Sequence, residues 1–78
     1  MTYNEYMKEI ATTQNNLVEW YGDFGIELNP MWDGNTAFDI TIAWPSTNNN
    51  SLDSTYRFAE ALSAAAFEAA KLVNITVD

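Results

Sequence analysis

The chain has no cysteine and no histidine among its 78 residues. Without cysteine there is no disulfide framework, no thiolate metal ligand and no cysteine nucleophile. Without histidine, the Ser-His and Cys-His nucleophile pairs and the commonest proton shuttle are also excluded. The three glycines, Gly22, Gly25 and Gly34, are scattered without a following lysine, so no phosphate-binding loop is present. We therefore predict a protein that is not an enzyme and that uses neither a metal nor a cofactor.

Two weaker signals for chemistry have simpler explanations. An enzyme built on a pair of carboxylates would need a pocket joining Glu27 and Asp39, and the sequence does not indicate one. Asp33, Asn35 and Asp39 bring oxygen atoms close to a turn, but their spacing does not match the twelve-residue calcium loop. A turn rich in Asp, Gly and Asn needs no metal to explain it.

Positive charge is scarce. Lys8, Arg57 and Lys71 are the only cations against eleven acidic residues, which gives a net charge of −8. Such a chain repels nucleic acid and anionic membrane surfaces, and it is steered toward basic surfaces. The alternative is that the charge serves solubility alone. No basic segment followed by an apolar stretch opens the chain, and no apolar run has membrane-spanning length, so we expect a cytoplasmic protein.

Apolar residues are plentiful enough for one folded domain over residues 1–78. They make up 47% of the chain, and eleven of them are aromatic. Thr2 and Glu5 form the pattern of a capping box, which predicts a helix that ends near Gly22. Its apolar stripe consists of Tyr3, Met7, Ile10, Leu17 and Tyr21, flanked by Tyr6 and Val18. Gln14 falls inside this stripe, where we expect its amide to find a backbone partner.

Residues 25 to 44 predict a β-hairpin with a turn at Asp33-Gly34-Asn35. A three-residue loop keeps the large apolar residues on one face, because it sets Ile26 opposite Ile42, Leu28 opposite Ile40 and Trp32 opposite Thr36. Pro30 has no amide donor, which indicates a sheet edge or a bulge at this point.

A second helix is predicted from a cap at Ser51 or Asp53 to about Asn74, after a polar connection over residues 45–51. Its main stripe consists of Phe58, Leu62, Ala65, Ala69, Leu72 and Val73. The β-branched tail Ile75-Thr76-Val77 could add a third strand. The predicted fold class is therefore α+β, in the order α-β-β-α with a short third C-terminal strand as an option. Both helices are expected to pack on one face of a small antiparallel sheet.

The most informative predicted surface is the face of the hairpin that points away from the apolar side. It consists of Glu27, Asn29, Met31, Ala37, Asp39, Thr41 and Ala43, with Asp33 at the turn, and it has no cation. The first helix adds Glu5, Glu9 and Glu19 on its exposed side, relieved only by Lys8. The alternative is an ordinary solvated sheet face. As a binding surface it would dock against Lys- and Arg-rich protein, with Met31 and Trp32 adding apolar contact.

A second candidate surface consists of Tyr56, Ser63, Phe67 and Ala70 on the second helix. An exposed aromatic stripe on an alanine-rich helix can form a dimer face. Two aromatic residues in so small a domain more often serve its core, so we expect burial against the first helix.

The leading functional hypothesis is a non-enzymatic inhibitor or adaptor that docks on a basic surface of a larger protein or nucleoprotein complex. In its sharpest form the carboxylates stand in for phosphates and block a nucleic-acid-binding groove. In size and charge the chain resembles the phage and mobile-element products that disable host defence, such as anti-restriction and anti-CRISPR proteins. No direct nucleic-acid or membrane binding is expected. The alternative is a self-associating structural or scaffolding protein that uses the aromatic helix face or the sheet edge near Pro30.

Overall fold

The first helix begins at the predicted capping box. The computed structural model of the chain describes residues 1–45 and 52–78, and its helix α1 spans Tyr3–Tyr21. The Glu5 amide donates to the Thr2 hydroxyl at 3.2 Å, and the Thr2 amide donates to the Glu5 carboxylate at 3.0 Å. These bonds satisfy donors that a helix N-terminus otherwise leaves free. The helix ends before Gly22, whose φ of +106° is one that residues with side chains rarely adopt.

The capping box makes the stability of the fold depend on pH in the acid range. The hydrogen bonds from the Thr2 amide and hydroxyl lower the pKa of Glu5 below its ordinary value. A carboxylate with a lowered folded-state pKa stabilises the fold above its unfolded-state pKa, and this stabilisation is lost as the pH falls through the folded value. We therefore expect Glu5→Gln to lower the free energy of unfolding at neutral pH, and we expect this difference to disappear at a pH low enough to protonate the wild-type carboxyl.

Urea unfolding of both proteins at the two pH values measures this difference. Glu9→Gln is the matched control, because Glu9 is an exposed carboxylate of the same helix outside the capping box. A Glu5→Gln loss of equal size at both pH values would show that the carboxylate charge is not what stabilises the cap.

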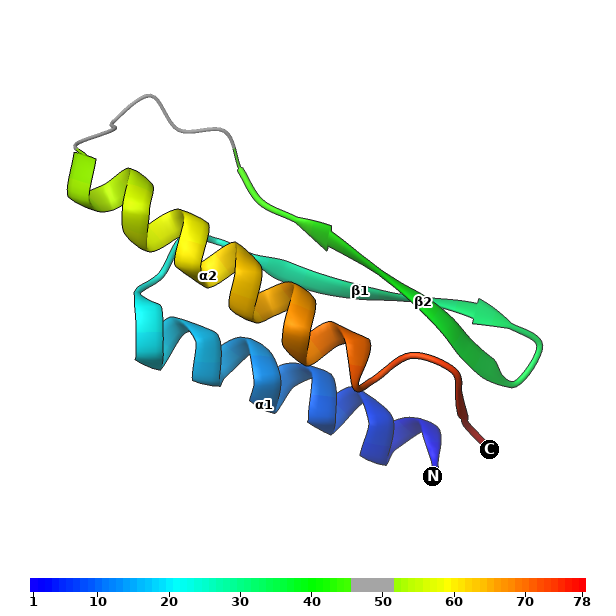
Figure 1. Cartoon of the computed structure of the whole chain (residues 1–78). Coiled ribbons are helices and arrows are strands. Elements are labelled where there is room, and N and C mark those ends of the chain that lie inside the picture. The colour runs from blue at the N-terminus through cyan, green and yellow to red at the C-terminus, as the bar shows by residue number, and fades with distance from the viewer. Residues whose placement is uncertain (46–51) are drawn as a thin grey trace.

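Three antiparallel strands form the sheet, in the order β1-β2-β3. Strand β1 spans Glu27–Asp33, β2 spans Thr36–Ala43, and β3 is the short C-terminal strand Ile75–Thr76. Figure 1 shows the long, twisted hairpin of β1 and β2 beside the two helices, with the chain termini close together near the hairpin tip. The predicted α+β class and the optional third strand are confirmed.

The predicted hairpin register is wrong. Asp33 pairs with Thr36, so the turn has two residues, and Gly34 takes its first position with a φ of +65°. Glycine at that position is the pattern of a type II′ turn, whose twist suits a hairpin. A bulge then shifts the pairing between Met31 and Trp32, so that Leu28 faces Ile42 instead of Ile40. The shift is two residues, so Leu28, Ile40 and Ile42 still share one face.

Strand β1 is an edge strand, and its edge offers few free donors. The Leu28 amide donates to the side-chain oxygen of Gln14 in α1 at 2.6 Å. Leu28 is therefore the backbone partner that we expected for the Gln14 side chain. Pro30, one strand repeat further on, has no amide hydrogen, and the bulge follows directly after Met31. Edges without a run of free donors resist pairing with another strand. The edge near Pro30 is therefore a poor site for self-association.

Helix α2 spans Leu52–Ala70, so it ends about four residues earlier than predicted. The amides of Lys71 and Leu72 donate three residues back, to Glu68 and Ala69, which closes the last turn. Asn74 then adopts a left-handed φ of +60°, which asparagine tolerates. The early end lets β3 reach β2. The predicted cap at Ser51 or Asp53 and most of the polar connection lie outside the described residues or side chains.

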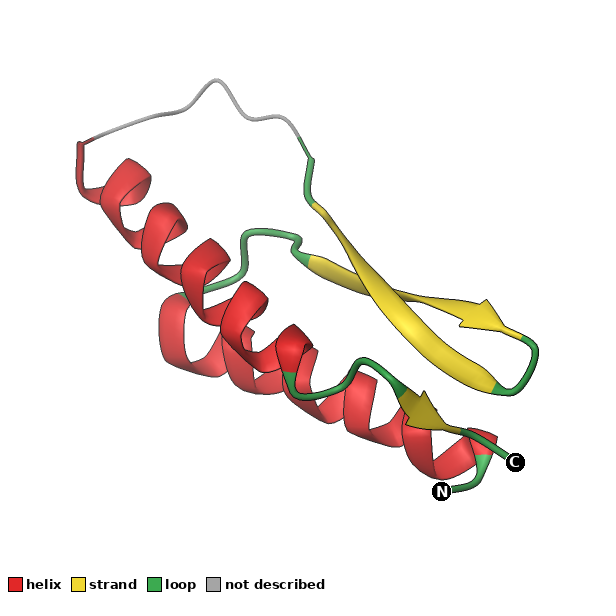
Figure 2. Ribbon diagram, turned by 45° about the vertical axis from the view of Figure 1, so that its right-hand side comes forward, coloured by secondary structure: helices red, strands yellow, loops and turns green. Residues whose placement is uncertain are grey.

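The helices lie side by side on one face of the sheet, as predicted (Figure 2). Between the layers lies one apolar cluster, to which all five elements or their flanks contribute. Its buried members are Tyr6, Ile10, Leu17, Leu28, Ala37, Ile40, Ala65, Ala69 and Val77. The predicted stripe of α1 is partly wrong, because Tyr6 is central whereas Tyr3 and Val18 are exposed. In α2, alanines face the core and allow close approach of the neighbouring backbones.

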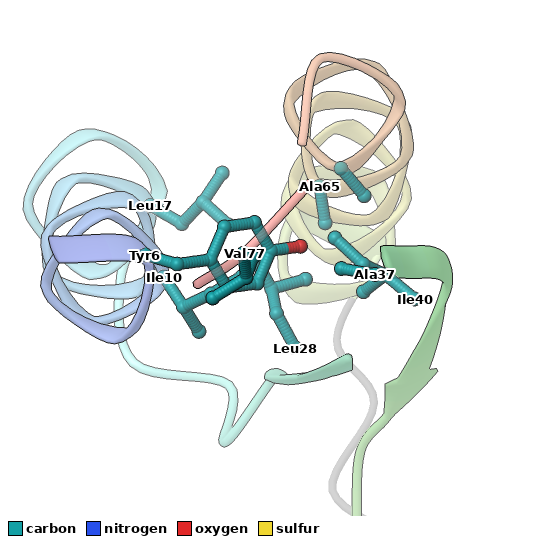
Figure 3. Packing of buried hydrophobic residues seen from close by; sticks show 9 residues of the cluster. Tyr6, Ile10, Leu17, Leu28, Ala37, Ile40, Ala65 and Val77 are labelled. Atoms are coloured by element: carbon teal, nitrogen blue, oxygen red, sulfur yellow. The ribbon is translucent and has the colours of Figure 1, made fainter. Parts of the chain in front are cut away.

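Tyr6 holds the centre of this cluster (Figure 3). Its side chain is 0% exposed, its ring packs edge-on against Trp32 at 5.3 Å between centroids, and its hydroxyl donates to the Leu72 carbonyl. Burial raises the pKa of the Tyr6 hydroxyl above its ordinary value, which keeps the group protonated as a donor. One residue therefore joins α1, β1 and the end of α2.

Candidate functional site

The hairpin surface that points away from the helices carries mixed acidic and apolar side chains. We call it the outer hairpin face. Its exposed residues are Glu27, Asn29, Met31, Asp39 and Thr41, and the exposed Phe38 lies next to Asp39 at the bulge. The pairs Asn29–Thr41 and Met31–Asp39 lie opposite each other across the two strands. The Thr41 hydroxyl donates to the Met31 sulfur at 3.3 Å, so this face has its own lateral contacts.

The β-bulge changes which residues belong to this face. Phe38 is the extra residue of β2 between the pairs Met31–Asp39 and Trp32–Ala37. An extra residue reverses the alternation of side chains beyond it. Ala37 is therefore buried in the core, against the prediction that it points outward, whereas Phe38 is 42% exposed beside Asp39. The sequence pattern did not predict that Phe38 is exposed. Pro30 was its one indication of a bulge in this region.

Trp32 lies on the apolar side of the hairpin, where the predicted alternation also places it, and not on the outer hairpin face. Its ring lies 5.5 Å from that of Tyr3 and 5.3 Å from that of Tyr6, both in α1. Its pairing with the buried Ala37 places it on the helix side of the sheet. The apolar contact available on the outer hairpin face therefore comes from Met31, which is 44% exposed, and Phe38 at the adjoining bulge is 42% exposed.

Negative charge on the hairpin has no local cation to balance it. The sequence has no lysine or arginine between Lys8 and Arg57, so the strands and their turn hold Glu27, Asp33 and Asp39 alone. Asp33 is exposed at the turn end of β1. The Asp39 carboxylate accepts the Ile40 amide at 2.9 Å, which fixes its position on the strand. All three cations of the chain lie in or directly after the helices.

The acidic residues of α1 belong to a different surface. Glu5, Glu9 and Glu19 are exposed, and at helical spacing they lie opposite Gln14, whose side chain reaches the sheet. The outer hairpin face also points away from α1, so the two acidic surfaces face different directions. Glu5 is in addition held by the capping box. The structure therefore brings together Glu27, Asn29, Met31 and Asp39, with Asp33 at the turn, and separates them from the helix carboxylates.

The second predicted surface is exposed, and the expectation of burial is wrong. Tyr56 is 68% exposed and Phe67 65% exposed, because α2 faces the core through alanines on the opposite side. Ser63 lies between them and is exposed too. Trp20 of α1, which the sequence analysis missed, is 59% exposed beside them. The sequence did indicate this exposure, because Trp20 lies outside the apolar stripe predicted for α1.

A shallow groove runs between the two helices on this side of the molecule. Its lining comprises Trp20, Tyr21, Tyr56, Ala59, Glu60, Ser63, Ala64, Phe67 and Glu68. Arg57 joins the lining at the end near Trp20 and Tyr56. Lys71 lies 4.5 Å from the centre of the Phe67 ring and 3.3 Å from the Glu68 carboxylate. We call the surface around this groove the helical aromatic face. It differs from the outer hairpin face because it carries both signs of charge.

Neither a metal cluster nor a membrane helix is found in the described part of the chain. In residues 1–45 and 52–78, no three acidic side chains come together as a ligand set for an ion. No helix in the same ranges is both long and apolar enough to cross a membrane. Comparison of the chain with protein-family models, with curated proteins and with solved structures gave no match. The outer hairpin face and the helical aromatic face are the two exposed surfaces available for binding.

Proposed function

We propose that the chain is a non-enzymatic inhibitor that docks its outer hairpin face on a basic, nucleic-acid-binding surface of a larger protein. The observation that carries this proposal is the composition of that face. Asp39 lies opposite the half-exposed Met31, and the half-exposed Phe38 lies next to Asp39 at the bulge. Neither strand carries a lysine or an arginine. Acidic residues steer the approach to a basic partner, and the apolar pair supplies the area that water leaves on contact.

The rigidity of the hairpin supports its use as a binding surface. The two strands are paired from Glu27–Ala43 to Asp33–Thr36 with one bulge at Phe38, and Leu28 and Ile40 anchor them in the core. A preformed surface loses little conformational entropy on binding. The blunted edge of β1 also directs binding to the side chains of the face and away from strand addition.

The spacing of the carboxylates favours a partial imitation of nucleic acid. Asp39 pairs with Met31, which is four residues from Glu27, so the two carboxylates stand roughly 13 Å apart along the strands. One strand of DNA carries roughly four phosphates over that length. The face therefore matches the sign of a phosphate backbone but not its density. The chain would then compete with nucleic acid by occupying the same basic groove of the partner protein.

In a cell this activity suits a phage or mobile-element product that acts in the host cytoplasm against a nucleic-acid-binding defence protein. Such a protein exposes a Lys- and Arg-rich groove of the kind that the outer hairpin face complements. The helix carboxylates Glu9 and Glu19 would contribute only to the long-range field, which salt screens over about 8 Å at physiological ionic strength.

A pair of charge-reversed variants tests this proposal. Glu27→Lys with Asp39→Lys reverses charge on the outer hairpin face, and Glu9→Lys with Glu19→Lys makes the same change in net charge on α1. Because like charges across an interface cost several kcal/mol, we expect the hairpin variant to lose about 100-fold or more in affinity for its basic partner. The α1 variant should lose at most a few-fold, through steering alone.

The measurement uses the wild-type chain and both variants as immobilised baits for host lysate at low and high salt. We expect a nucleic-acid-binding protein on the wild-type and α1-variant baits, released by added duplex DNA and by salt. Equal losses in both variants would show that net charge alone governs binding. Capture that persists with the hairpin variant would rule out the outer hairpin face.

A further inference from the structure

We propose that two copies of this chain pair through the helical aromatic face, with their α2 helices antiparallel. The proposal does not depend on the function assigned to the outer hairpin face, which lies on the far side of the sheet. It starts from the three large aromatic side chains Trp20, Tyr56 and Phe67, each about two-thirds exposed around one groove. In a dimer of this kind, both outer hairpin faces would remain exposed.

The exposed aromatic area is larger than solubility alone explains. Aromatic side chains bury roughly 150–250 Å² each, so these three present on the order of 400 Å² to water. This area is comparable to the largest apolar patch on a typical monomer, and such patches are often functional. Small side chains between the aromatics, Ala59 and Ser63, let a second helix approach closely.

The charges on α2 favour a second copy as the occupant. If a twofold axis crosses α2 near residue 62, Arg57 of one copy lies beside Glu68 of the other, with an offset of at most one residue along the helix. The same axis places Tyr56 of one copy beside Phe67 of the other, again with an offset of at most one residue. One residue corresponds to about 1.5 Å along a helix. Because an interface with twofold symmetry must be self-complementary, the coincidence of an ion pair and an aromatic pair about one centre favours this arrangement.

The net charge of the chain also points to this face. A chain with a charge of −8 repels its own copies over most of its surface. On the helical aromatic face, however, Arg57 and Lys71 balance Glu60 and Glu68. Two copies can therefore approach here without meeting a net field of one sign. An all-basic partner would instead be drawn to the outer hairpin face.

Sedimentation of the full chain from micromolar to millimolar concentration tests the proposal. We expect a monomer–dimer equilibrium that strengthens as salt rises, because salt screens the overall repulsion between copies. Docking of the outer hairpin face on a basic partner would weaken with salt, so the two proposals fail independently. A monomer at every concentration and salt level would overturn the dimer.

Matched aromatic variants locate the interface. Phe67→Asp places a charge in the proposed interface of both copies, and we expect self-association to fall at least about 30-fold. Phe38→Asp makes the same change at an exposed position of strand β2, away from α2, and should leave self-association within a few-fold of the wild type. Equal losses in the two variants would overturn the proposal, because added charge rather than location would then govern association.

A charge swap tests the antiparallel register. Arg57→Glu and Glu68→Arg should each weaken the dimer, and the double variant should recover most of the loss. Circular dichroism of each variant checks that the helices are kept, as expected for side chains outside the core. A double variant no stronger than the single variants would contradict the pairing of Arg57 with Glu68.

Discussion

Replacement of Tyr6 by alanine is expected to remove a large share of the free energy of unfolding of the chain. Removing a fully buried aromatic ring from a packed core costs about 3–5 kcal/mol. A domain of this length has a total stability of roughly 4–12 kcal/mol. The loss is large here because the same ring packs against Trp32 and its hydroxyl serves the Leu72 carbonyl. Urea unfolding followed by circular dichroism measures the loss.

Tyr6→Phe separates the contribution of the hydroxyl from that of the ring. It keeps the aromatic packing and leaves the Leu72 carbonyl without its donor, so we expect a loss of about 1–2 kcal/mol. If Tyr6→Ala and Tyr6→Phe destabilised the chain equally, the ring would contribute nothing, and the central place given to it in the core would be wrong.

Enlarging Ala65 is expected to have the second-largest effect on the fold. Ala65 is fully buried at the centre of the alanine row with which α2 faces the core. A leucine there has to displace α1 or β2, because packed interiors have no spare volume. We expect Ala65→Leu to destabilise the chain by about 1–3 kcal/mol.

The matched control for this prediction is the next residue along the helix. Ala66 is exposed, so Ala66→Leu adds the same side chain without displacing a neighbour and should change stability by less than about 0.5 kcal/mol. Thermal unfolding of both variants gives the comparison. Equal tolerance of leucine at the two positions would mean that the space facing Ala65 is not closely packed.

The elements of the fold follow from local signals in the sequence. The capping box and Gly22 mark both ends of α1, and alternation of apolar residues marks the hairpin. The register does not follow, because side-chain alternation cannot distinguish pairings that differ by two residues. The end of α2 was also predicted wrongly, because β3 pairs with β2 a few residues after Ala70 and this pairing is a tertiary interaction.

The candidate site was predictable in part. Glu27, Asn29, Met31 and Asp39 were identified correctly as exposed on one side of the hairpin, because strand alternation sets their direction. Phe38 was missed because a bulge has no reliable sequence pattern in a single chain. The exposure of Tyr56 and Phe67 was missed because composition cannot say which side of an alanine-rich helix the core will use.

We expect the outer hairpin face, and not the acidic side of α1, to bind basic protein surfaces. Titration of the ¹⁵N-labelled chain with a short Arg- and Lys-rich peptide tests it residue by residue. We predict that amide shift changes concentrate on residues 27–33 and 38–41 and disappear in the hairpin charge-reversed variant. Changes spread equally over the exposed side of α1 at Glu9 and Glu19, or centred there, would show that the outer hairpin face is not the binding surface.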